Sequence, residues 1–140
     1  MPLGLVLSSG TRHDSTQLEP VLDAISVPRR RGRPRKRPGL LIADKAYSGG
    51  PCRALLRRRG IPHVIPQPRI PHTQKRKRLG RPTRFDKALY AQRYLVERAI
   101  LQLKGFRRIA TRYEKRAVNF LAMVHIAAIL MWINYLSDTV

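Results

Sequence analysis

Four polar residues whose side chains could take part in chemistry lie on one face of a predicted helix. Residues 90–104 contain no Gly or Pro and are rich in good helix formers, so the sequence predicts a helix there. At about 100° per residue, Tyr90, Arg93, Glu97 and Lys104 fall within roughly 60° of one another on that helix. A carboxylate between two cations suits an ordinary surface ion pair, and it also suits a functional polar stripe. The local pattern leaves both interpretations open.

A second carboxylate, Asp44, lies within residues 40–50, where four apolar residues precede it and a Tyr and a Gly-Gly turn follow. This pattern predicts a buried strand with Asp44 at its carboxyl-terminal tip, where reactive groups gather in open α/β sheets. An Asp at the end of a strand also commonly caps the following turn. Of the eight acidic residues, Asp44 and Glu97 are the two at positions where a metal ion could bind.

Paired acids in a very basic chain fit phosphodiester chemistry with divalent cations. Mg²⁺ (or Mn²⁺) prefers oxygen ligands, and Mg²⁺ usually takes only one or two carboxylates, which leaves room for water and phosphate. Two such ions about 4 Å apart can clamp the attacking and leaving oxygens of a phosphodiester. Asp44 and Glu97 are therefore the candidate metal ligands.

The spacing Tyr90-x2-Arg93-x3-Glu97-x6-Lys104 matches the Y-R-E-K signature of DDE-type insertion-sequence transposases without a gap or substitution. The letters ADKAY around Asp44 resemble the A-D-K-A/G-Y motif that carries the second catalytic Asp of these enzymes. The resemblance implies that Asp44 and Glu97 are the second and third catalytic acids and metal ligands. It implies that the other three signature residues contact phosphates or displaced bases at the transposon end. It also implies a ribonuclease H-like fold.

The resemblance covers almost the whole chain but only about the C-terminal half of such a transposase. Residues 1–140 are therefore expected to form a partial domain whose N-terminal strands are missing. Asp14 and Asp23 come too late in the resemblance to be the first acid, so we expect the isolated chain to have little or no activity. A two-ion site would form only if the missing Asp were supplied. A homodimer, or pairing with a polypeptide from an upstream reading frame, is the expected kind of partner; a truncated remnant would instead bind or compete for transposon ends without catalysis.

The chain carries 29 Lys and Arg against 8 Asp and Glu, a formal net charge of +21. Such an excess of positive charge indicates a polyanionic binding partner. The resemblance implies that this partner is double-stranded DNA at insertion-sequence ends and target sites. Basic, flexible loops are predicted at 27–39 and 67–84, and a third basic cluster contains Arg108. In the first loop, Arg31 and Arg33 belong to an RGRP segment that resembles an AT-hook for the A·T minor groove. A sequence-blind phosphate-binding loop and an RNA-associated protein are the alternatives.

The order of the predicted elements is that of an α/β fold with a mixed or partly parallel sheet. Strands are expected at residues 3–7, 40–44 and 61–66, and helices at 15–25, capped by Ser15 or Thr16, at 51–59 and at 117–136. The last helix is expected to supply most of the core, with Phe120 and Trp132 as anchors. The helix around Glu97 is expected to bury a face made of Leu89, Val96, Ala99, Ile100, Leu103 and Phe106.

The only cysteine, Cys52, excludes an intrachain disulfide and a CxxC zinc site, and it suits a reducing cytoplasm. Residues 117–136 have the length of a membrane span, but Asn119, His125 and Asn134 within them favour a buried core helix. The chain is accordingly expected to have no membrane partner and to be cytoplasmic, associated with the nucleoid.

Overall fold

The computed structural model describes residues 1–67 and 85–139. The predicted basic loop at 67–84 therefore lies outside the described residues except for Gln67. The described part is α/β, with a majority of helices and one small sheet of two parallel strands. The two strands that pair are parallel, which fits the partly parallel alternative of the prediction, and no mixed sheet is found within these residues.

The first half of the chain forms a small α/β unit around the sheet. Strand β1 (Leu41–Ile42) pairs with β2 (His63–Val64), and helix α2 (Gly50–Arg58) connects them. Helix α1 (Leu18–Ala24) precedes β1, and short 3₁₀ turns η1 (Asp14–Gln17) and η2 (Lys45–Ser48) precede α1 and α2. As predicted, α2 ends before a glycine: Gly60 adopts a φ of +62°, which L-residues rarely adopt.

The buried core belongs to this first half. Apolar side chains of α1, α2 and the β2 segment pack together, and Leu56 is completely buried at the centre. The buried members of this core are Leu18, Leu22, Cys52, Leu56, Ile61 and Ile65. Cys52 packs in the first turn of α2, with its Sγ 3.7 Å from the carbonyl oxygen of Ser15.

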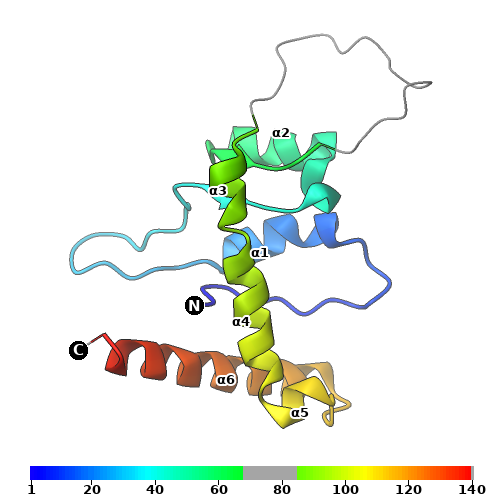
Figure 1. Cartoon of the computed structure of the whole chain (residues 1–140), viewed down its shortest axis with the longest axis vertical. Coiled ribbons are helices and arrows are strands. Elements are labelled where there is room, and N and C mark those ends of the chain that lie inside the picture. Colours follow the sequence, from blue (N-terminus) through cyan, green and yellow to red (C-terminus); the bar gives the residue numbers. More distant parts are fainter. Residues whose placement is uncertain (68–84, 140) are drawn as a thin grey trace.

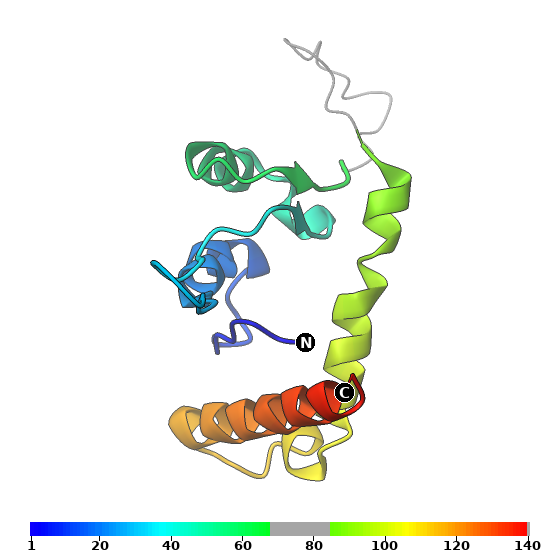
Figure 2. The same cartoon turned by 90° about the vertical axis from the view of Figure 1, so that its left-hand side faces the viewer.

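The second half consists of helices. Helices α3 (Lys87–Ala91) and α4 (Tyr94–Lys104) follow one another as a column beside the α/β unit (Figures 1 and 2). The short α5 (Arg107–Ala110) then turns the chain into α6 (Ala117–Ser137), which runs across the lower end of the column (Figure 1). The predicted helix at 117–136 is confirmed almost residue for residue.

The predicted single helix at 90–104 is wrong, because the chain breaks between α3 and α4. At Gln92 and Arg93 the amides bond carbonyls three residues back: Gln92 N donates to Leu89 O at 3.1 Å and Arg93 N donates to Tyr90 O at 3.0 Å. This spacing is that of a tight 3₁₀ turn rather than of an α-helix. No Gly or Pro marks the break, so helix propensity gave no sign of it.

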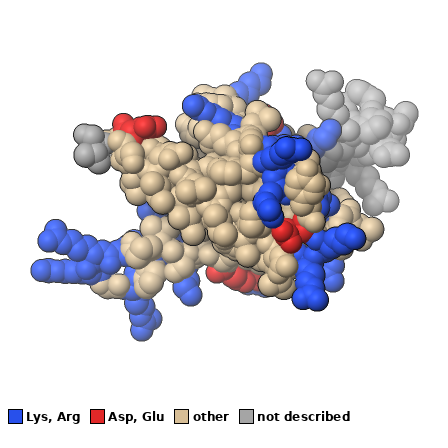
Figure 3. Space-filling model, turned by 90° about the horizontal axis from the view of Figure 1, so that it is seen from below, with Lys and Arg blue, Asp and Glu red and all other residues tan. Residues whose placement is uncertain are grey.

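The two apolar helices bury less than predicted. On α4, Val96 and Ile100 remain 51% and 46% exposed. On α6 only Ala127, Ala128 and Met131 are buried, whereas Phe120 and Trp132 are half-buried, so this helix does not supply most of the core. The physical reason is that no described element covers the outer faces of these helices. Seen from below, the surface over α6 is largely free of charged side chains (Figure 3).

Among the helices of the described residues, α6 alone is long and apolar enough to cross a membrane. It has 21 residues, and 22% of its most apolar stretch is buried. A core helix of a water-soluble protein passes the same test, so length and composition do not distinguish the two.

The predicted strand at residues 3–7 is wrong, because this segment is extended but forms no ladder with any described strand. It is tied to the last helix instead, where Trp132 Nε1 donates a hydrogen bond of 2.8 Å to the carbonyl oxygen of Pro2. The predicted cap of the next helix is also wrong. His13, rather than Ser15 or Thr16, caps η1, and its Nδ1 accepts from Ser15 N at 3.3 Å.

Candidate active site

Asp44 lies just beyond the carboxyl end of β1, where the sequence predicted it. Its carboxylate is half-buried, and Oδ1 accepts a hydrogen bond of 2.8 Å from Ala46 N at the start of η2. The expected capping of the following turn is thus present. Oδ2 accepts no hydrogen bond from any described residue, so this oxygen can take another partner.

Strand pairing and one arginine hold this end of the sheet in place. Ala43 N donates to Val64 O across the two strands at 3.3 Å. From α2, Arg53 donates to Ser48 O at 3.2 Å and to Ile65 O at 3.0 Å. Arg53 therefore joins the segments that follow β1 and β2, and it positions the turn that Asp44 caps. The sequence analysis missed this role, since Arg53 is one of several arginines in its helix.

Glu97 lies in the first turn of α4 with a side chain that is 60% exposed. One carboxylate oxygen is 3.1 Å from a guanidinium nitrogen of Arg93, four residues earlier. The pair confirms that Arg93 and Glu97 share a face despite the break in the helix. A carboxylate in the first helical turn also complements the positive end of the helix dipole.

Arg93 connects the two candidate acids electrostatically. A hydrogen bond with Tyr90 raises the pKa of its guanidinium, and the negative charges of Glu97 and Asp44 add to that rise. Tyr90 in turn packs on Phe85, with ring centroids 5.2 Å apart. Glu97 pairs with Arg93 directly, whereas Asp44 makes the smallest contribution to the raised pKa of Arg93.

The remaining predicted residues lie away from this group. Lys104 is the last residue of α4, about 10 Å along the helix axis from Glu97 and on the same face. Arg108 lies in α5 and pairs with Glu114 at 3.4 Å. Arg31 and Arg33 lie in the segment between α1 and β1, which extends from the α/β unit (Figure 1).

Tyr47 is a member of this neighbourhood that the sequence analysis did not single out. Burial raises the pKa of its hydroxyl, and the charges of Asp14, Asp44 and Cys52 contribute to the same rise. Its place three residues after the strand-end Asp was the available signal. Tyr47 also packs against the core that supports β1.

The chemistry of this site fits an oxygen-seeking divalent cation. Asp44 offers the oxygen that accepts no hydrogen bond, and Glu97 offers an exposed carboxylate that Arg93 neutralises. Within the described ranges, no three His, Cys, Asp or Glu side chains gather closely enough to hold a metal ion together. The two carboxylates correspond to the number that Mg²⁺ commonly takes from a protein.

Comparison with known proteins identifies the family. The model of the family described as "Transposase DDE domain" matches residues 1–132. The chain is 37% identical over 117 residues to "Putative transposase for insertion sequence element IS402" of Burkholderia cepacia, which covers 83% of this chain and 49% of that protein. It is 33% identical over 96 residues to "Putative transposase for insertion sequence element IS6501" of Brucella ovis, which covers 69% of this chain and 68% of that protein. No solved structure matches the chain.

The chain spans about half the length of its IS402 relative. The family model nevertheless covers nearly all of its residues, including both ends of the Tyr90–Lys104 signature and the strand-end Asp44. The chain belongs to the family of DDE-type insertion-sequence transposases.

Proposed function

We propose that this chain contributes the second and third catalytic acids, Asp44 and Glu97, to a transposase that cleaves and transfers DNA strands at the ends of an insertion sequence. DNA transposition is the function that the family suggests. The residue assignments and the metal dependence are our proposal.

One observation carries the assignment: Asp44 lies just beyond the carboxyl end of β1, and its Oδ2 accepts no hydrogen bond from any described residue. Glu97 adds an exposed carboxylate in the first turn of α4. One or two such carboxylates are what Mg²⁺ usually takes from a protein.

In this proposal, Asp44 and Glu97 would hold Mg²⁺ or Mn²⁺. When bound, the metal would supply a Lewis acid that stabilises charge on the transferring phosphate. Arg53 and the β1–β2 pair keep the Asp44 carboxylate in position. Glu97 must leave its exposed pair with Arg93, which costs little in water. Arg93 is then available to a DNA phosphate.

The DNA partner follows from the charge and the signature residues. We propose that Tyr90, Arg93 and Lys104 contact the transposon end, since they lie along one side of the α3–α4 column. Arg108, which is 64% exposed, would add a contact beyond the end of α4. Such a protein would be cytoplasmic and associated with the nucleoid.

The fold that we propose for the complete domain is ribonuclease H-like. The support is a parallel strand pair joined by a helix, with a carboxylate beyond the carboxyl end of the first strand. The exposed apolar faces of α4 and α6 also leave room for further elements of such a domain.

We further propose that the isolated chain cleaves DNA poorly, because only two of the three expected acids are identified among the described residues. A second polypeptide, such as one from an upstream reading frame, would have to supply the third acid and so complete a two-ion site; a homodimer is the other assembly that we propose. The alternative function is non-catalytic binding to transposon ends. The net charge of +21 and the many exposed arginines favour DNA binding in either case.

The test uses the chain translated together with the reading frame upstream of Met1, incubated with a labelled insertion-sequence end and Mg²⁺. We expect Asp44→Asn and Glu97→Gln to abolish strand cleavage without weakening DNA binding. Glu19→Gln is the matched control, since it removes an exposed carboxylate of α1 that pairs with Arg59, at the other end of the sheet from Asp44, and it should cleave normally.

Two results would count against the proposal. Normal cleavage by Asp44→Asn would remove this residue from the catalytic acids. Absence of cleavage by the extended, unsubstituted protein, with DNA binding retained, would favour the non-catalytic alternative.

A further inference from the structure

The basic segment between α1 and β1 is folded as a hairpin. Val27 and Arg35 form an antiparallel bridge, with Val27 N donating to Arg35 O at 2.9 Å and Arg35 N donating to Val27 O at 2.8 Å. Gly32, between them, has a φ of +85°, a conformation that suits glycine at a turn. Because of this bridge, cations of residues 29–37 lie near Gly60 and Pro62, which precede β2. The sequence alone predicts only a flexible loop for these residues.

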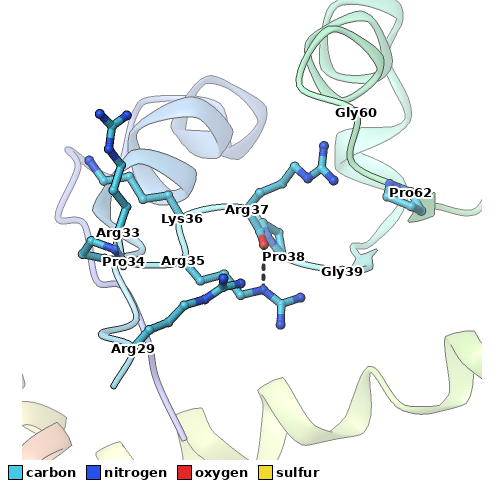
Figure 4. A pocket seen from close by; sticks show the side chains of 10 residues that line it. All are labelled: Arg29, Arg33, Pro34, Arg35, Lys36, Arg37, Pro38, Gly39, Gly60 and Pro62. Atoms are coloured by element: carbon cyan, nitrogen blue, oxygen red, sulfur yellow. Dashed lines mark hydrogen bonds between the residues drawn. The ribbon is translucent and has the colours of Figure 1, made fainter. Parts of the chain in front are cut away.

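These cations line a pocket of about 570 Å³. Five of its ten lining residues are Arg29, Arg33, Arg35, Lys36 and Arg37 (Figure 4). The other side is formed by prolines and glycines, including Gly60 and Pro62 just after α2. The pocket therefore has a cationic wall facing a backbone wall without side-chain carboxylates.

The backbone holds the guanidinium group of Arg35 and lies close to that of Arg37. Arg35 Nε donates a hydrogen bond of 3.1 Å to the carbonyl oxygen of Arg37 (Figure 4). A Cβ atom at Gly39 would lie 3.2 Å from a guanidinium nitrogen of Arg35, and one at Gly60 would lie 3.0 Å from a guanidinium nitrogen of Arg37. The missing side chains of these two glycines make room for the guanidinium groups.

The pocket arginines also differ from other arginines of the chain in their partners. Arg59, Arg93 and Arg108 each pair with a carboxylate, whereas none of the four pocket arginines pairs with one within the described residues. Lys36 is near enough to Asp23 to help lower the pKa of that carboxyl group. Four gathered guanidinium groups without an acidic partner repel one another, and an anionic ligand would relieve that repulsion.

The pocket lies at the opposite end of the sheet from the candidate acids. Its backbone wall precedes β1 at Gly39 and precedes β2 at Gly60, while Asp44 follows β1. Because the strands are parallel, these are the amino ends of both. A ligand in the pocket would therefore contact a different region of the protein from one at Asp44.

We propose that this pocket is a second binding site for the phosphate backbone of duplex DNA, separate from the Asp44–Glu97 site. Several guanidinium groups distributed along a hairpin match successive phosphates better than one small anion, since each guanidinium can bond phosphate oxygens in a bidentate manner. That the polyanion is DNA rather than RNA rests on the proposed function.

The test measures DNA binding by the full chain without divalent metal, using a fluorescent duplex of about 20 base pairs between about 50 and 200 mM salt. The pocket variant is R29Q/R33Q/R37Q, which leaves Arg35 to support the hairpin. The matched control, R12Q/R57Q/K115Q, removes three exposed cations elsewhere. Circular dichroism spectra of both variants, compared with that of the unsubstituted chain, check that they remain folded.

We expect the pocket variant to lower the slope of log K against log salt by about 2.7, at about 0.9 for each lost phosphate contact. The control should change that slope by less than about 1, which is the value of one contact. Equal slopes for the pocket variant and the control would overturn the proposal. A larger loss of affinity for duplex RNA than for duplex DNA in the pocket variant would overturn the DNA assignment.

A third protein, D44N/E97Q, separates this inference from the proposed function. It should not lower the slope, because its substitutions remove two carboxylates and no cation. If the substitutions at Asp44 and Glu97 leave cleavage intact while the pocket variant still loses slope, the proposed function is wrong and the pocket proposal stands. If they abolish cleavage while the pocket variant keeps its slope, the pocket proposal is wrong and the proposed function stands.

Discussion

Replacing Leu56 with alanine tests whether the core of the first half supports the candidate site. Leu56 is 0% exposed, and it lies at the centre of the cluster that joins α1, α2 and the β2 segment. Truncating a fully buried leucine removes its packing and leaves a cavity, at a cost of about 2–5 kcal/mol. We take about 3 kcal/mol, against a stability of roughly 5–15 kcal/mol for an ordinary domain. For a chain of this size, the melting temperature should fall by about 10 °C.

Leu101→Ala is the matched control. Leu101 is 67% exposed on α4, so the same change should alter the free energy of unfolding by less than about 0.5 kcal/mol. Urea unfolding followed by circular dichroism measures both variants. An equal loss of stability in the two would refute the reasoning, since it would mean that the outer face of α4 is buried in solution. A small loss in Leu56→Ala would refute the described core.

Two further predictions concern single contacts. Arg59 hydrogen-bonds Asp23 at 2.6 Å and Glu19 at 2.7 Å, and the bond to Asp23 is the main cause of the lowered pKa of that carboxyl group. Since the folded state holds Asp23 ionised, this stabilisation is present above the ordinary pKa of about 3.9 and is lost as the pH falls through the lowered pKa. Melting curves should therefore show Arg59→Gln less stable than the unsubstituted chain at neutral pH and converging with it in acid; a constant difference would contradict the assignment. Trp132→Phe removes the hydrogen bond to the carbonyl oxygen of Pro2 and should cost about 0.5–1.5 kcal/mol in urea unfolding, and an unchanged midpoint would mean that the N-terminal segment does not dock on α6.

Local signals in the sequence predicted the elements that depend on local chemistry. Gly60 marked the end of α2, because a positive φ there needs no information from elsewhere in the chain. The apolar run before Asp44 predicted β1 and the strand-end position of this acid. The largely apolar pattern after Ala117, free of charged residues and of Gly and Pro, predicted the bounds of α6.

The features that the sequence did not reveal depend on distant partners. Residues 3–7 have the composition of a strand, but a strand requires a neighbour, and none of the described segments provides one. The apolar faces of α4 and α6 predicted burial, yet burial depends on what packs over a helix. The break between α3 and α4 at Gln92 and Arg93 contains no Gly or Pro, so the local sequence did not predict it.

The candidate site was predicted in part, for a related reason. Residue types and spacing placed Asp44 and Glu97, and the structure shows the ion pair between Glu97 and Arg93 that the spacing allowed. The supporting role of Arg53 required knowledge of which carbonyl groups lie near α2. The cationic pocket depended on the Val27–Arg35 bridge and on two glycines from different segments, which no local pattern connects.

The central claim is that Asp44 and Glu97 share a divalent cation, and Mn²⁺-induced broadening of amide NMR signals tests it most directly. Broadening detects weak binding, so the isolated chain can be used. The account predicts that Mn²⁺ broadens the signals around η2 and the first turn of α4 together, and that Asp44→Asn abolishes both effects while Glu19→Gln leaves them. Broadening that is confined to one of the two segments, or that persists in Asp44→Asn, would contradict a shared site.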